Sequence, residues 1–391
     1  MSDAPRLATL LERADALFRD QALASVRAWK ARTGGLAVGF LPIYVPRELL
    51  HAQGVLPIGL MGGRPDLEII KGDAYYQSYI CHLPRSTIEL GLNGSYDALD
   101  GLIFPAICDV IRNLSGIWQM LFPNVLVHYL DVPQNFDPSI GGAFYRRDLE
   151  SLSQALEARG ARPLTDEALR ASIALYNENR RLVRELYALR HREPWKVPTH
   201  ELYVVLRAAL LIPVEEATPL FAEYLALASE DESRRPQDQA RVLVTGSFCE
   251  QPPLALIKTL ERSGCYIVDD DFIQVHRFIR GDIPVDGDPL QRLVEALLTD
   301  AVASPTRYIA DEVKGADLER RVKESGAEGV LFCAPSFCDP ALLDQPMAVR
   351  AVERTGIPWT AFKYAENNGQ FQVIREQAGT FADSIKLWSG A

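Results

Sequence analysis

The sequences GLIFPAICDVIRNL, at residues 101–114, and GVLFCAPSFCDPALL, at residues 329–343, decide the fold that we expect. Each begins with a short apolar run, which is typical of a buried strand, and continues through a Cys-Asp pair into a segment of helical periodicity. A strand followed by a helix is the repeating unit of parallel α/β sheets. Because this unit occurs twice, we expect two α/β halves that resemble copies of each other.

The sequence around the two units repeats the same order of elements. Residues 36–60 show a strand, a helix that begins near a proline and ends at a glycine, and a second strand, and residues 241–268 show the same order. The apolar spacing over residues 7–29 predicts one helix, and residues 73–92 are expected to be helical with a break near Pro84. The expected organisation is an N-terminal helix at 1–35, an α/β domain at 36–141, a helical segment at 142–228, a linker at 229–239 and a second α/β domain at 240–391.

The composition excludes several classes of protein. The chain has 391 residues, with 41 Lys and Arg against 52 Asp and Glu, and a net charge of −11. Such a chain repels polyanions, so nucleic-acid binding is not expected. Its apolar runs are shorter than the roughly 20 residues that cross a bilayer, and the first residues lack the apolar core of a signal peptide, so we expect no membrane insertion. The six cysteines are then expected to be reduced thiols in the cytoplasm.

Several cysteines lie where an α/β sheet places its chemistry. Cys108 and Cys338 each follow a strand and precede a helix, and ligands of open α/β sheets bind beyond the carboxyl ends of the strands. A helix N-terminus stabilises the thiolate, which is the form that ligates iron. Any one cysteine is more often a small buried apolar residue, and Cys265 is expected to be one. Cys249 and Cys333 also follow strands and are reserve ligands or cleft-lining residues.

Five short blocks, in order along the chain, resemble the signature blocks of the 2-hydroxyacyl-CoA dehydratase and benzoyl-CoA reductase family. They are PRELLHAQGVLP at residues 46–57, Cys81, CDVIR at 108–112, FCDP at 337–340 and DQP at 344–346. The resemblance implies two flavodoxin-like parallel-sheet domains with an added helical segment. It also implies a [4Fe-4S] cluster held by three cysteines, with a non-cysteine ligand or substrate at the fourth iron position. The cysteines that fall on the three ligand positions are Cys81, Cys108 and Cys338.

The chain departs from the family pattern at one position near the third ligand. Cys333 lies five residues before Cys338, where members of the family usually have no second cysteine. Some relatives hold a larger, double-cubane cluster with added ligands. Cys249 or Cys333 could serve such a centre.

The resemblance also implies a function. Members pair two paralogous iron-sulfur subunits, which receive electrons, with ferredoxin as the donor, through an ATP-hydrolysing activator. The block GSFCEQP at residues 246–252 and the chain length favour the smaller, C-type subunit of an ATP-dependent benzoyl-CoA reductase of anaerobic aromatic degradation, which converts this acyl-CoA to a cyclic dienoyl-CoA. The alternatives are a subunit of a 2-hydroxyacyl-CoA dehydratase, which is a lyase, and a non-catalytic electron-relay or structural subunit. No GxxxxGK[ST] loop occurs in the sequence, so ATP and Mg²⁺ are expected on partner subunits.

Other polar residues have a structural explanation beside a functional one. His51 and His82 are weak candidates for proton donation or a supporting hydrogen bond, because helical histidines are more often structural. The acidic run at residues 269–271 is expected as a solvated loop or a helix N-cap, with Mg²⁺ binding or an arginine contact as the alternatives. The segment RRLVR at residues 180–184 is expected on a solvated helix face, with CoA phosphates as the alternative partner.

Overall fold

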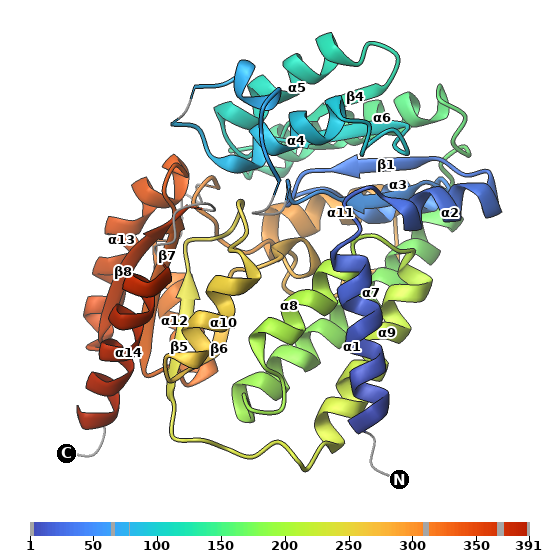
Figure 1. The fold of residues 1–391 in the computed structure, drawn as a ribbon. Helices are drawn as coiled ribbons and strands as arrows, with labels where there is room; N and C mark the ends of the chain where they lie inside the picture. The colour runs from blue at the N-terminus through green and yellow to red at the C-terminus, as the bar shows by residue number, and fades with distance from the viewer. Residues whose placement is uncertain (1–3, 64–66, 78, 308–312, 366–370, 389–391) are drawn as a thin grey trace.

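Two four-stranded parallel sheets form the framework of the chain (Figure 1). The computed structural model describes residues 4–63, 67–77, 79–307, 313–365 and 371–388. The first sheet has the order β2-β1-β3-β4 and consists of β1 (Ala37–Phe40), β2 (Leu56–Gly59), β3 (Gly101–Pro105) and β4 (Leu126–Leu130). The second has the order β6-β5-β7-β8 and consists of β5 (Ala240–Thr245), β6 (Cys265–Asp270), β7 (Gly329–Pro335) and β8 (Trp359–Tyr364). The two orders are equivalent and flavodoxin-like, which confirms the expected fold class.

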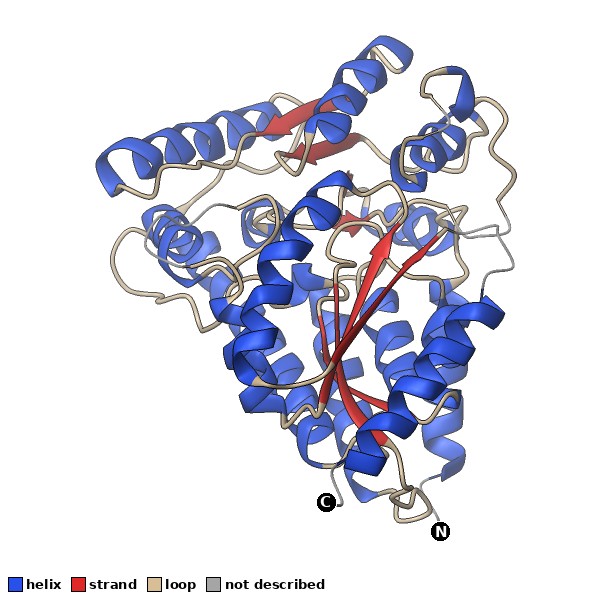
Figure 2. Ribbon diagram, turned by 90° about the vertical axis from the view of Figure 1, so that its left-hand side faces the viewer, coloured by secondary structure: helices blue, strands red, loops and turns tan. Residues whose placement is uncertain are grey.

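The central strands are buried apolar runs because helices cover both faces of a parallel sheet. All five residues of β3 and all seven residues of β7 are buried. Figure 2 shows the twisted second sheet with helices on either side of it. The two sequence stretches that predicted the fold therefore supply the central β3 and β7 and the helices that follow them.

The helices fall into three groups along the chain. The first group is α1 (Ala4–Phe18), α2 (Ala24–Thr33), α3 (Arg47–Ala52), α4 (His82–Leu92) and α5 (Asp109–Leu121). The second is α6 (Ala143–Glu157), α7 (Asp166–Arg192), α8 (Thr199–Ala208) and α9 (Val214–Glu230). The third is α10 (Leu254–Arg262), α11 (Pro289–Glu295), α12 (Ala316–Ser325), α13 (Asp339–Thr355) and α14 (Phe371–Trp388). Among the described residues, no helix is long and apolar enough to cross a membrane.

Four shorter turns complete the structure. Two are 3₁₀ turns, η1 (Gly72–Ala74) and η3 (Gln274–His276). Two are π-helical turns, η2 (Pro138–Gly142) and η4 (Ala296–Asp300). The π turn η4 directly follows α11, so the hydrogen-bond spacing of this helical stretch changes at Ala296.

Helix α7 connects the helical segment with both sheets. Its 27 residues begin after Thr165, whose side chain accepts a hydrogen bond from the backbone N–H of Ala168 over 3.2 Å. Acidic residues lie in its first turn and basic residues in its last, as the helix dipole favours. It packs against α3, α9, α12 and β6. A single helix therefore contacts elements that belong to both α/β halves.

Two predicted helices are divided differently in the structure. The N-terminal helix predicted over residues 7–29 is two helices, because Leu23 adopts a left-handed conformation with φ 54° and the Asp20 carboxylate accepts from the N–H of Ala24 over 2.8 Å at the start of α2. The segment at 73–92 is helical only from His82, apart from η1. Pro84 lies in the first turn of α4, where a missing N–H breaks no hydrogen bond, so it does not break the helix.

Candidate functional site

Three cysteines precede the first residue of three helices. Cys108 lies between β3 and α5, Cys338 lies between β7 and α13, and Cys81 precedes α4. We call these three residues the helix-capping cysteines. Cys108 and Cys338 occupy equivalent places in the two α/β halves, because each follows the third strand of its sheet along the chain.

The backbone of the following helix contacts the sulfur at Cys108 and at Cys338. Burial raises the pKa of the Cys108 thiol, and the N–H groups of Val110 and Ile111, which donate to its sulfur, oppose that shift. Burial likewise raises the pKa of Cys338 to about 12, opposed by the N–H of Ala341. These amides are the groups that stabilise a thiolate once a cation binds it.

The fold brings cysteines of both halves within electrostatic reach of one another. Burial raises the pKa of Cys81 well above its ordinary value, and the nearby Glu250, Cys338 and Cys108 raise it further. The pKa of Cys249 is raised first by burial and then by Cys338, Cys108 and Cys81. Four thiols thus gather from four separate loops. Across the described part of the chain, no three Cys, His, Asp or Glu side chains lie close enough together to hold a metal ion as they stand.

The other two cysteines lie inside the second half. Cys333 is fully buried in β7, where burial raises its pKa and its neighbours are Ser247 and Asp271. Cys265, the first residue of β6, is also fully buried, as expected for a core residue. Of the two cysteines expected as reserve ligands, Cys249 is the one whose thiol lies within electrostatic reach of the helix-capping cysteines.

Glu250 connects the two halves at the helix-capping cysteines. Its Oε2 accepts hydrogen bonds from the N–H groups of His82, over 2.7 Å, and Leu83, over 3.3 Å, at the start of α4. The Tyr364 hydroxyl donates to the backbone carbonyl of Glu250 over 2.7 Å and fixes the loop after β5. Glu250 was not among the expected site residues. Its only signal in the sequence was its place beside Cys249 in the GSFCEQP block.

The two candidate histidines lie in different surroundings. His82 is buried as the first residue of α4, next to Cys81. His51 contacts the helical segment: its Nδ1 lies 2.8 Å from the Ser172 hydroxyl and its Nε2 lies 2.9 Å from a carboxylate oxygen of Glu215. These contacts hold α3 against α7 and α9, which is a structural arrangement.

The expectation of a solvated acidic run at residues 269–271 was wrong. Asp269, Asp270 and Asp271 are 3%, 1% and 4% exposed. Asp270 accepts from Arg190 over 2.7 Å, and Asp269 accepts from Arg321 over 2.7 Å. The carboxylates are buried because α7 and α12 cover the end of β6, and buried carboxylates persist where arginines pair with them.

The expectation of a solvated arginine face on α7 was wrong for Arg180. Arg180 is 5% exposed and forms a buried ion pair with Glu48 of α3. Arg181 matches the expectation, since it is 43% exposed and pairs with Glu178 and Glu185 on its own helix. The docking of α3 on α7 therefore buries Arg180 and leaves its neighbour Arg181 in contact with solvent.

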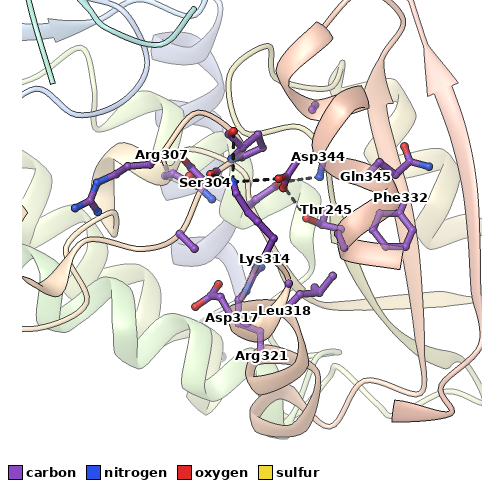
Figure 3. Close-up of a pocket in the computed structure, with 18 of the residues that line it drawn as sticks. Thr245, Ser304, Arg307, Lys314, Asp317, Leu318, Arg321, Phe332, Asp344 and Gln345 are labelled. Atoms are coloured by element: carbon purple, nitrogen blue, oxygen red, sulfur yellow. Dashed lines mark hydrogen bonds and ion pairs between the residues drawn. The ribbon is translucent and has the colours of Figure 1, made fainter. Parts of the chain in front are cut away.

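A pocket opens at the carboxyl end of the second sheet, where α/β sheets bind ligands (Figure 3). Its volume, open solvent included, is ≈ 790 Å³. Lys314 lies between the Ser304 carbonyl, 3.0 Å from its Nζ, and the Asp344 carboxylate, 3.1 Å from it. The wall includes Ala341, whose N–H donates to Cys338, so this part of the pocket lies close to Cys338.

Comparison with known proteins relates the whole chain to one group. The family model described as "2-hydroxyglutaryl-CoA dehydratase, D-component" matches residues 42–385. The chain is 53% identical to the C-type subunit of benzoyl-CoA reductase from Thauera aromatica, over 98% of this chain and 99% of the relative. It is 27% identical to the (R)-phenyllactyl-CoA dehydratase beta subunit of Clostridium sporogenes, over 90% of this chain and 93% of the relative. It is 28% identical to the beta subunit of (R)-2-hydroxyglutaryl-CoA dehydratase from Acidaminococcus fermentans, over 90% and 93%.

Proposed function

Because the chain belongs to the 2-hydroxyglutaryl-CoA dehydratase D-component family, as its signature blocks indicated, we propose that it is the C-type subunit of an ATP-dependent benzoyl-CoA reductase. The observation that carries the assignment is the 53% identity to the C-type benzoyl-CoA reductase subunit over nearly all of both chains, against 27% and 28% for two dehydratase beta subunits. The same identity bears out the expectation of an oxidoreductase subunit.

The helix-capping cysteines are the residues to which we assign a [4Fe-4S] cluster. Iron-sulfur clusters are bound by cysteine thiolates, and these three thiols lie at helix N-termini within electrostatic reach of one another. Cys249 is the residue we assign to any additional ligation, because its thiol lies among the other three, whereas Cys333 faces Ser247 and Asp271. When bound, a cluster of this kind supplies electrons at potentials that reach about −700 mV.

The chain itself positions the thiols and excludes water from them. The amides of Val110, Ile111 and Ala341 donate to the sulfurs and so stabilise their negative charge. Glu250 holds the start of α4, and with it Cys81, against the loop of the second half. Cys249 and Cys338 are each 6% exposed, so most of their surface is protected from solvent.

We assign ATP hydrolysis and the supply of electrons to partner proteins. We propose a paralogous iron-sulfur subunit, an ATP-hydrolysing activator that binds ATP and Mg²⁺, and ferredoxin as the electron donor to that activator. The relatives' names as subunits support a heteromeric assembly. We place the complex in the cytoplasm, because all six cysteines are free thiols.

The experiment compares two reactions of the complex purified without oxygen. With ATP and reduced ferredoxin, we expect benzoyl-CoA to be reduced to a cyclic dienoyl-CoA, with iron and sulfide in the protein. The family description and the dehydratase relatives favour a second candidate, a 2-hydroxyacyl-CoA dehydratase subunit. Dehydration of 2-hydroxyacyl-CoA thioesters without reduction of benzoyl-CoA would establish that candidate instead. An iron-containing complex whose substrate binds only to the paralog would identify this chain as an electron relay.

A further inference from the structure

An arginine-rich cleft lies between α7 and α12, apart from the helix-capping cysteines. Its volume, open solvent included, is ≈ 1000 Å³. Residues of the segment that follows β6 also line it. We call this cavity the arginine cleft. The arginines that line it are Arg180, Arg184, Arg277, Arg280, Arg320 and Arg321.

Carboxylates of the arginine cleft are shared between arginines. Asp317 pairs with Arg280, over 2.9 Å, and with Arg320. Asp269 pairs with Arg277, over 3.3 Å, and with Arg321, over 2.7 Å. One carboxylate cannot neutralise two guanidinium groups.

Most of the other carboxylates that pair with these arginines lie outside the lining of the cleft. Arg180 pairs with Glu48, Arg184 with Asp282, and Glu324 lies 3.9 Å from Arg320. Asp270, which also lies 3.2 Å from Arg277, forms a 2.7 Å pair with Arg190. The residues that line the cleft are six arginines and three carboxylates, those of Asp269, Asp317 and Glu324, so the lining carries more cations than anions within a chain whose net charge is −11. Such a local excess is what binding of an anion requires.

Several buried polar atoms around the cleft have no hydrogen-bond partner among the described residues. They are Nη1 of Arg184, Nε of Arg277, Nε2 of His191 and Oε1 of Gln274. Gln274 is 7% exposed and lines the cleft. Buried groups of this kind are normally satisfied, so their concentration in one cleft indicates that a polar ligand contacts them.

The cleft and the pocket of Figure 3 share part of their lining. Gln274, Asp317 and Arg321 line both cavities, and Figure 3 shows Asp317 and Arg321 at the end of the pocket away from Asp344. The pocket wall extends to Gly246 and to Ala341, the residue that donates to Cys338. The two cavities are thus neighbours, and the wall of the pocket includes a residue whose N–H contacts Cys338.

We propose that the arginine cleft binds the phosphate-rich adenosine end of a CoA thioester, whose pantetheine arm follows the pocket so that the acyl group reaches the helix-capping cysteines. Guanidinium groups bind phosphate oxygens in pairs of parallel hydrogen bonds, and CoA carries a 3′-phosphate and a diphosphate at its adenosine end. The unpartnered Oε1 of Gln274, between the two cavities, suits an amide N–H of pantetheine. This inference rests on the proposed function, because it takes the substrate to be an acyl-CoA bound by this subunit.

The test is equilibrium binding of adenosine 3′,5′-bisphosphate to the assembled complex, measured by calorimetry without oxygen. Arg184→Gln and Arg280→Gln each remove one charge from a side chain that is 38% or 37% exposed, and Asp317 keeps Arg320 as its partner in the second variant. Arg181→Gln is the matched control, since Arg181 lies on α7 and pairs outside the cleft. We expect the Kd to rise at least about tenfold in each cleft variant and less than about twofold in the control.

Further measurements separate the alternatives. Benzoyl-pantetheine, which lacks the nucleotide, should bind the wild type and the cleft variants equally. In the wild type, adenosine 3′,5′-bisphosphate should slow amide exchange in α12 and leave α5 unchanged, a result that does not depend on any variant. Unchanged Kd values in both cleft variants, or protection elsewhere, overturn the inference, whereas the proposed function stands if benzoyl-CoA is still reduced. ADP that binds the cleft and is not displaced by CoA would mark a free-nucleotide site and refute the CoA assignment. A wild-type complex that binds no CoA thioester would overturn both.

Discussion

Replacing Glu250 by Ala should loosen the start of α4 and thereby the position of Cys81. Glu250 is 5% exposed, and its carboxylate accepts the N–H groups of His82 and Leu83 across the two halves. Without it, two N–H groups in the first turn of a buried helix lose their acceptor. The negative charge that opposes the positive end of the helix dipole is also lost.

The magnitude follows from these contacts. An unsatisfied buried donor costs about 1–3 kcal/mol, and a charge at a helix end contributes about 0.3–1 kcal/mol. Two such donors and the charge together lead us to expect that Glu250→Ala lowers the free energy of opening at the start of α4 by about 2–7 kcal/mol. Glu250→Gln keeps an acceptor oxygen and loses only the charge, so it should cost about 1 kcal/mol.

Hydrogen exchange of the His82 and Leu83 amides measures this opening directly. A loss of about 2 kcal/mol corresponds to exchange about thirtyfold faster. Glu89→Ala is the matched control, because the Glu89 carboxylate accepts the N–H groups of Ile70, Lys71 and Gly72 within the first half. It should expose residues 70–72 and leave the amides of residues 82 and 83 protected. Equal protection of those two amides in wild type and Glu250→Ala would refute the proposed link between the halves.

The other predictions concern the cluster, a buried carboxyl and a buried ion pair. Replacing any helix-capping cysteine by Ser should remove iron from the protein and abolish reduction of the substrate. Metal analysis of Cys265→Ser and Cys333→Ser should find that these two variants keep their iron. Loss of iron in Cys333→Ser would mean that the third ligand is wrongly assigned or that the cluster is larger than one cubane. Burial raises the pKa of Asp271 to about 6, above its ordinary 3.8, so the folded state binds this proton more tightly and stability falls as pH rises between these values. Asp271→Asn should remove about 2–3 kcal/mol of that fall in urea unfolding from about pH 4 to about pH 7.5, and an unchanged pH profile would contradict this. Glu48→Ala leaves the Arg180 charge buried without its carboxylate, so we expect a loss of about 3–5 kcal/mol in the same assay; a loss below about 1 kcal/mol would show that the pair is solvated.

The pattern of the sequence was sufficient for the two sheets and for the places of Cys108 and Cys338. Buried strands and amphipathic helices leave local signals, because each element must turn apolar residues toward the same core. The repeated unit of strand, Cys-Asp pair and helix therefore predicted both halves. It also placed two cysteines at equivalent helix starts, as the structure has them.

The surroundings of these cysteines depended on contacts between distant segments. Glu250 meets α4 from 168 residues away in the chain, and Arg180 meets Glu48 from 132. The charged runs at residues 180–184 and 269–271 read as solvated because charge pattern alone does not tell which helix covers a residue. Only the docking of α7 and α12 on β6 brought arginines and carboxylates into one network and made the arginine cleft. Apolar periodicity records which face of an element is buried, but the partner of a buried charge is set by how whole elements pack, and that was decided by the tertiary structure.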